Sequence, residues 1–203
     1  MTNERLQWKA KVTQLLNSSA VTEPTRKALR ARMEEAKGGP RFFEEPLFQL
    51  LSIVCDRLVD QEQEAQLVEV AFFIDERLAD GTCDGWRYND MPPDGDMLRQ
   101  GLQGIDQTAS ILFGDPFLVL QKEKQLTVLM QIQQGKPPGT IWSSLPADRF
   151  FEELLAEATE IFYSHPLVQV AIGYTGMADA AGWQKIGLNE ANDFTTVEKV
   201  TTT

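Results

Sequence analysis

The stretch PADRFFEELLAEATEIF, residues 146–162, decides how this chain folds. Its apolar residues recur at three- and four-residue steps, and they are Phe150, Phe151, Leu154, Leu155, Ala158, Ile161 and Phe162. That spacing is typical of an amphipathic α-helix with one buried side, and a proline such as Pro146 suits the first helical turn. The stretch therefore predicts a helix, and the same spacing returns in most other parts of the chain.

Earlier segments predict further helices. Apolar stripes at helical spacing indicate helices over residues 46–58, 67–78, 98–112 and about 122–134. No convincing run follows the two-residue period of a strand. Pro166 is expected to begin a short turn, and the chain beyond Gly173 is rich in glycine and aromatic residues. We therefore predict an all-α fold, an irregular helical bundle with a Gly/aromatic-rich C-terminal segment.

A helical pair is predicted at the N-terminus. The first helix has an apolar stripe of Trp8, Val12, Leu15 and Leu16. Thr22 and Pro24 suit the N-cap and first turn of a second helix, which Gly38-Gly39-Pro40 is expected to end. Because this glycine–proline break is the clearest boundary in the chain, we expect a helical arm over 1–39, a helical domain over 40–194 and a flexible tail over 195–203.

The charge of the chain excludes some classes of partner. The 203 residues have a formal net charge of −11, with 42% hydrophobic and 24% charged residues. A phosphate backbone or an anionic membrane surface repels such a protein, so we expect neither nucleic-acid nor membrane binding. No run approaches the roughly 18 apolar residues of a membrane-spanning helix. Residues 1–37 contain neither an apolar signal core nor a twin arginine, so we expect a cytoplasmic protein. A periplasmic location is the alternative if export is supplied otherwise. Two free thiols, Cys55 and Cys83, are expected in that compartment.

The sequence contains few residues that could perform catalysis. Its one histidine, His165, excludes metal sites that need two, and phosphate-binding, dinucleotide-binding and nucleophile-elbow motifs are absent. A nucleophilic pair of Cys83 and His165 stays open as an alternative. The acidic pairs at 44–45, 62 and 64, and 152–153 are interpreted as solvated helix faces, and the Phe72-Phe73 and Phe150-Phe151 pairs as core. We predict no catalytic, cofactor-binding or metal-binding residue in this chain.

Two segments favour a binding surface. The long loop after residue 80 contains Trp86, Arg87 and Tyr88, residue types that contribute most binding energy at protein interfaces. Near the C-terminus, glycines accompany aromatic residues, which allows close backbone approach beside flat rings. We predict a partner interface formed by Trp86, Arg87, Tyr88, Tyr163, His165, Tyr174 and Trp183. The alternative is that both segments pack on the chain's own core.

His165 has a second interpretation. It precedes Pro166 at the end of the predicted helix, where the backbone becomes extended. A helix C-terminus favours a positively charged imidazole, and we expect a local cap or an interface hydrogen bond. Proton transfer is a further alternative.

Several ordered motifs resemble one protein family. The tetrad from Cys55 to Leu58 is similar to the D-R-L-I-P element of the gluconate 2-dehydrogenase subunit 3 family, although Val59 and Asp60 replace its last two residues. The segment 71–75 looks like the family's x-F-I-D helix. The segments 162–166 and 182–187 together resemble its closing pattern G-F-Y-x-x-P … G-W-x-x-I-G, with Ile161 in place of the first glycine.

The resemblance implies a role without catalytic residues. Small subunits of this family pair with a large catalytic subunit of the glucose-methanol-choline oxidoreductase type, which holds FAD, and a cytochrome c often accepts the electrons. The resemblance therefore implies an accessory subunit that stabilises and assembles an FAD-dependent oxidoreductase acting on sugars, glycosides or polyols. The alternatives are a stand-alone helical scaffold or regulatory protein, and an enzyme that uses Cys83.

The interface hypothesis predicts the effect of removing one aromatic ring. Trp183→Ala should weaken the complex by about 2 kcal/mol or more, because large aromatic side chains at the centre of an interface contribute most of its binding energy. Co-purification and activity of the complex measure this effect. Full retention of both would contradict the assignment of Trp183 to the interface.

Overall fold

The fold is entirely helical in the residues that the structure describes. The computed structural model of the chain describes residues 3–33, 38–62, 66–82, 91–174, 176–177 and 179–180. Within these ranges it contains eight α-helices and two 3-10 turns, without a strand, which confirms the predicted all-α class. None of these helices has an apolar stretch long enough to span a bilayer.

The chain divides into two compact units. Unit 1 contains residues 1–35 and 162–203, and unit 2 contains residues 36–161. The N-terminal helical pair thus shares its unit with the C-terminal segment. The predicted division into an arm over 1–39, a helical domain over 40–194 and a tail over 195–203 stays a prediction.

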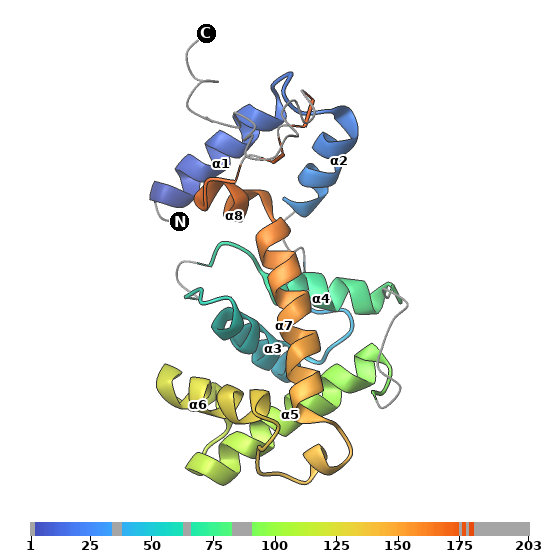
Figure 1. Ribbon diagram of the computed structural model, residues 1–203, viewed down its shortest axis with the longest axis vertical. Coiled ribbons are helices and arrows are strands. Elements are labelled where there is room, and N and C mark those ends of the chain that lie inside the picture. Colours follow the sequence, from blue (N-terminus) through green and yellow to red (C-terminus); the bar gives the residue numbers. More distant parts are fainter. Residues whose placement is uncertain are drawn as a thin grey trace, which may run out of the picture. The chain divides into compact units, whose positions relative to one another are not determined.

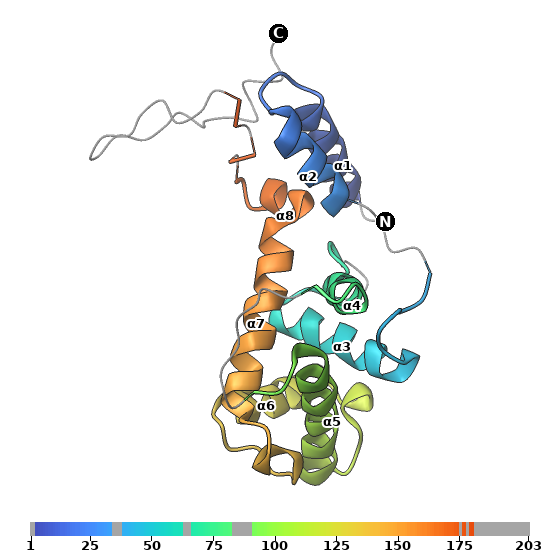
Figure 2. The same cartoon turned by 90° about the vertical axis from the view of Figure 1, so that its right-hand side faces the viewer.

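Unit 2 is built from five α-helices and two short turns (Figure 1). The helices are α3 (Glu45–Leu58), α4 (Val70–Ala79), α5 (Asp94–Phe113), α6 (Lys122–Gln133) and α7 (Ala147–Ser164), and the turns are η2 (Phe117–Val119) and η3 (Ile141–Ser143). The last three residues of α7 belong to unit 1. Helices α3 and α4 pack together, and α5 lies beside α6 (Figure 2).

Proline and glycine set several ends of these helices, as the sequence predicts. Pro46 occupies the first turn of α3, where its missing N–H has no helical partner to lose. Gly114 caps α5 with φ of 80°, a left-handed conformation that favours glycine. Gly135, with φ of 67°, follows the end of α6. The boundaries therefore follow from local backbone chemistry.

The aromatic side chains Trp142 and Phe150 pack against two glycines of α5. Gly101 and Gly104 leave space that a Cβ atom would fill, since a Cβ at Gly101 would lie 2.0 Å from the Phe150 ring and one at Gly104 would lie 2.5 Å from Trp142. The two aromatic rings have centroids 5.8 Å apart. The Trp142 indole Nε1–H donates to Thr108 Oγ1 at 2.8 Å. Both glycines therefore permit α5 to approach the aromatic core closely.

A buried carboxylate on α4 holds the segment that leads into α3. Asp75 is buried, and its two oxygens accept backbone N–H bonds from Arg41, Phe42 and Phe43 at 2.6, 3.0 and 2.9 Å. Three consecutive amides would otherwise lack helical partners, which is costly away from water. Asp75 therefore fixes the position of residues 41–43 on α4.

A second side chain on α4 joins two further helices. The Arg77 guanidinium donates two hydrogen bonds to the Glu157 carboxylate on α7, and its Nη1 donates to Asp94 at the start of α5 at 2.9 Å. Burial raises the pKa of Glu157 above its ordinary value, and the two bonds from Arg77 counteract part of that effect. Arg77 therefore ties α4 to both α5 and α7.

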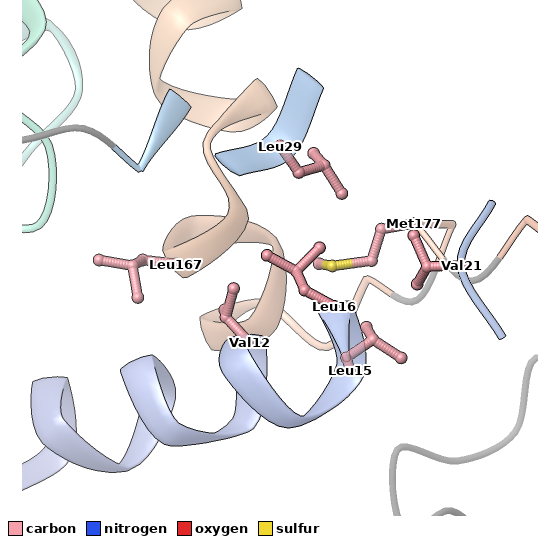
Figure 3. Packing of buried hydrophobic residues seen from close by; sticks show 7 residues of the cluster. All are labelled: Val12, Leu15, Leu16, Val21, Leu29, Leu167 and Met177. Atoms are coloured by element: carbon pink, nitrogen blue, oxygen red, sulfur yellow. The ribbon is translucent and has the colours of Figure 1, made fainter. Parts of the chain in front are cut away.

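Unit 1 combines elements from both ends of the chain. It contains α1 (Asn3–Leu16), α2 (Glu23–Arg32) and α8 (Pro166–Ala171), and α1 packs against α8. Figure 3 shows its apolar cluster, in which Met177 lies near Leu16 and Val21. The complete cluster is Val12, Leu15, Leu16, Val21, Leu29, Leu167 and Met177. The predicted apolar face of the first helix is confirmed, with Trp8 half-buried at its edge.

Asp179 fastens the C-terminal segment to α2. Its carboxylate accepts from the Thr22 backbone N–H at 2.8 Å and from the hydroxyls of Thr22 and Thr25 at 2.6 Å each. The Thr22 bonds, followed by that of Thr25, lower the pKa of Asp179 to about 2. Thr22 does occupy the predicted N-cap position, but its hydroxyl is bound to Asp179 and makes no side-chain cap.

Two local predictions are wrong in detail. Residues 166–171 form a six-residue helix, where a turn is predicted, because Pro166 suits the first helical position and His165 accepts the Leu167 amide. Helix α2 ends at Arg32 with Met33 as its cap, several residues before the Gly38-Gly39-Pro40 break.

The Asp75 contacts predict a large loss of stability on truncation. Asp75→Ala should lower the free energy of unfolding by about 3 kcal/mol or more, because it leaves the amides of residues 41–43 without their acceptor. Urea denaturation measures the change. Asp80→Ala, at the C-cap of the same helix, removes only an exposed side-chain contact with Arg41 and should leave the urea midpoint nearly unchanged. Equal losses in the two variants would contradict the role given to Asp75.

Candidate partner-binding surface

The structure describes three of the seven predicted interface residues. Tyr163, His165 and Tyr174 all belong to unit 1. Trp86, Arg87, Tyr88 and Trp183 lie outside the described residues, so their part in an interface stays a prediction.

Tyr163, Ile172 and Tyr174 are large exposed side chains of unit 1 within twelve residues of one another in the sequence. The exposed fractions of Tyr163 and Tyr174 are 51% and 54%, and that of Ile172 is 59%. We call these three residues the unit-1 aromatic surface. A Cβ at Gly176 would lie 2.1 Å from Tyr174 Oη, so the Tyr174 side chain lies directly against the glycine backbone. Close approach of a ring to a glycine is therefore present here, as the sequence predicts for this segment.

His165 is a buried capping residue. It is only 7% exposed, and its Nδ1 accepts a hydrogen bond from the Leu167 backbone N–H at the start of α8, at 3.3 Å. Burial, with smaller contributions from the charges of Arg5 and Arg32, lowers its pKa to about 4. The predicted local cap is present. A helix C-terminus favours a positively charged imidazole, but the cost of burying that charge has the larger effect on the pKa of His165.

The described cysteine is an inert thiol. Cys55 is buried and unbonded, and burial raises its pKa well above the ordinary value, so it is present as a thiol at neutral pH. Cys83 lies outside the described residues. Within the described ranges no group of three or more His, Cys, Asp or Glu side chains could hold a metal ion.

The residues of the D-R-L-I-P-like element support the fold. Asp56 is buried, and its Oδ1 accepts from the side-chain amides of Gln61 and Gln66 at 2.9 Å each. Burial raises its pKa despite these bonds. The Arg57 Nε–H donates to Gln125 on α6 at 2.8 Å. These side chains therefore close the loop after α3 and join α3 to α6.

The predicted acidic and aromatic pairs differ in burial. Glu44, Glu45, Glu62 and Glu152 are exposed, as expected for solvated faces, and Glu153 is half-buried. The described residues do not include Glu64. The Phe150-Phe151 pair is buried in the core, whereas the Phe72-Phe73 pair is half-buried, with its rings edge to face at 5.4 Å.

Several polar residues with structural roles were not predicted. Asp75, Arg77 and Asp179 make the contacts that join separate elements. For Asp75 a signal exists, since it lies four residues after Ala71 on the buried side of α4. A carboxylate on an apolar stripe indicates a buried hydrogen-bond acceptor.

A comparison with protein-family models identifies the family. A model named Gluconate 2-dehydrogenase subunit 3 matches residues 45–188, which are 144 of the 203 residues. The chain belongs to this family. The matched range contains α3 to α8, the unit-1 aromatic surface and Asp179, whereas α1 and α2 lie before it. A search of curated proteins and a search of solved structures found no match.

The family name indicates what kind of protein this is. Gluconate 2-dehydrogenase subunit 3 is a component of a dehydrogenase complex, and membership is consistent with an accessory, non-catalytic role. A subunit needs surfaces that contact other subunits. The exposed rings of Tyr163 and Tyr174 lie within the matched range and are candidates for such a surface.

The capping role of His165 predicts a pH dependence of stability. Its pKa is about 4 in the folded chain and 6.5 when unperturbed, so between these values the unfolded chain binds the proton and the folded chain does not. The stability is present above pH 6.5 and should fall by on the order of 3 kcal/mol as the pH falls towards 4.

The variant His165→Asn distinguishes the capping role of this residue from the effect of its protonation on stability. Asparagine is a good N-cap but does not titrate, so the variant should keep its stability at neutral pH and lose the slope between about pH 5 and 6.5. Urea unfolding at several pH values measures this slope. Because His165 is the one histidine of the chain, a slope that persists in the variant would contradict the assignment.

Proposed function

We propose that this chain is a non-catalytic accessory subunit that stabilises and assembles an FAD-dependent oxidoreductase acting on sugars, glycosides or polyols. The observation that carries the proposal is the family match over residues 45–188. The partner is a large catalytic subunit of the glucose-methanol-choline type, which binds the FAD, and a cytochrome c can accept its electrons. We further propose that the complex is cytoplasmic.

The polar groups of the described core support a structural role for this chain. Asp75 accepts three backbone amides, Glu157 binds Arg77, and Asp179 binds two threonines. His165 accepts the amide of Leu167. Each of these groups stabilises a contact within its unit, which suits a subunit that contributes shape and surface to a complex. The reactive chemistry is assigned to the partner.

The proposal is tested by isolating the native complex. A tagged chain expressed in its own host should recover a second, larger polypeptide with the absorption bands of flavin, and the mixture should oxidise sugars or polyols. Mass spectrometry identifies the second chain, and the spectrum shows its cofactor. A colourless, monodisperse chain recovered alone would contradict the accessory role and favour a stand-alone scaffold or regulatory protein.

The unit-1 aromatic surface predicts which residues matter for assembly. Tyr163→Ala and Tyr174→Ala should each weaken binding of the large subunit about tenfold or more, because exposed aromatic rings contribute strongly when an interface covers them. Binding of the purified large subunit to each variant measures the effect.

Leu6→Ala provides the matched control. Leu6 is a large apolar residue of unit 1, it is 51% exposed, and it lies before the family match. Its removal should leave the affinity unchanged. A control that weakens binding as much as the tyrosine variants would show that the effect is not specific to the unit-1 aromatic surface.

A further inference from the structure

The exposed apolar side chains of unit 2 lie in one short part of the chain. All six large apolar side chains that are exposed in the described part of this unit come from residues 111–130. They are Ile111, Leu112, Leu118, Val119, Leu126 and Met130. Scattered single exposed apolar residues are ordinary, whereas these six come from α5, η2 and α6, and α5 contacts both other elements. We call these six residues the α5–α6 face.

Specific contacts hold the elements of this face together. The buried Phe117 of η2 donates its N–H to Asp106 on α5 at 2.8 Å, and its carbonyl accepts from Gln125 on α6 at 3.1 Å. The Lys124 ammonium of α6 lies 5.3 Å from the centroid of the Phe113 ring at the end of α5. These hydrogen bonds tie η2 to α5 and α6, and the two other residues of this turn, Leu118 and Val119, are exposed.

Helix α6 has apolar residues on two sides. Val128, Leu129 and Ile132 face the core, whereas Leu126 and Met130, four residues apart, share an exposed side. A helix with one solvated face normally has polar residues there, and apolar residues on opposite sides indicate burial on both. Leu126 and Met130 are therefore two apolar residues on the exposed side of α6, beside the exposed Glu123 and Thr127.

The charge of unit 2 indicates what kind of molecule covers this face. Residues 36–161 contain ten Lys and Arg and 22 Asp and Glu, a net charge of −12, whereas residues 111–130 contain two of each sign and are neutral. A second copy of the chain would bring two strongly acidic units together around the face, and like charges oppose that contact. A different chain with an apolar centre and a neutral or basic rim fits this pattern.

We infer that the α5–α6 face is a docking site for the flavin-bearing catalytic subunit. The docking surface of that subunit has an apolar centre and a rim that is neutral or basic. This inference rests on the proposed function, and it identifies a second contact region, in unit 2, besides the unit-1 aromatic surface. The face lies inside the range that matches the family, as expected for a surface that serves the role of the subunit.

Two substitutions test this docking site without disturbing the core. Val119 and Met130 are 67% and 53% exposed, so Val119→Asp and Met130→Glu should fold normally, which thermal melting verifies. Each places a charge where the partner's apolar surface docks. Each variant should recover at least tenfold less flavoprotein than the wild-type chain when the native complex is isolated.

Gln103→Glu is the matched control. Gln103 is an exposed residue of α5 outside residues 111–130, so the variant adds one negative charge to the same unit away from the face. It should recover as much flavoprotein as the wild-type chain. A similar loss in the control would attribute the effect to net charge and overturn the inference.

The other outcomes are distinct. Recovery of flavoprotein by the wild-type chain and equally by both variants overturns the docking site and leaves the proposed function standing. A wild-type chain that recovers no flavoprotein overturns the proposed function, and this inference with it. Sedimentation in which the wild-type chain self-associates while both variants are monomers that still bind flavoprotein would assign the face to a second copy.

Discussion

The buried carboxylate of Asp75 is the contact on which the arrangement of unit 2 depends most. It satisfies three consecutive amides before α3, so the chain can cross α4 without leaving unpaired backbone groups in the interior. Two residues later, Arg77 reaches Glu157 on α7 and Asp94 on α5. One short helix thus positions three other elements through directional bonds, while the apolar core supplies most of the driving force for folding.

Unit 1 depends on contacts between the N-terminal helices and the segment that follows α7. The helices α1 and α2 lie before the part of the chain that matches the family, whereas α8 and the segment around Asp179 lie within it. Met177 fills the apolar cluster of the N-terminal pair, and Asp179 binds the threonines at the start of α2. The additional helices of this chain are therefore integrated with the family's closing segment by both apolar and polar contacts.

The two described surfaces suit a subunit that acts through contact. Asp75, Arg77, Glu157 and Asp179 bind partners within their units. Apart from Leu6, the large exposed apolar side chains of the described residues belong to the unit-1 aromatic surface or the α5–α6 face. Such exposed apolar side chains offer contact surface to another chain. Rigid support matters for such surfaces, because binding of a partner then loses little conformational entropy in ordering them. For the α5–α6 face, the hydrogen bonds of Phe117 to Asp106 and Gln125 provide that support.

Local pattern in the sequence determined the helical class, the positions of the helices and the glycine or proline at several ends, because these features depend on side chains three or four residues apart. The family resemblance could likewise be identified from short motifs. The tertiary structure alone decided which elements the polar residues join, because Asp75, Arg77 and Asp179 bind partners 34, 80 and 157 residues away. It also decided that His165 is neutral and that Leu126 and Met130 are exposed, since burial depends on neighbours that no local spacing reveals.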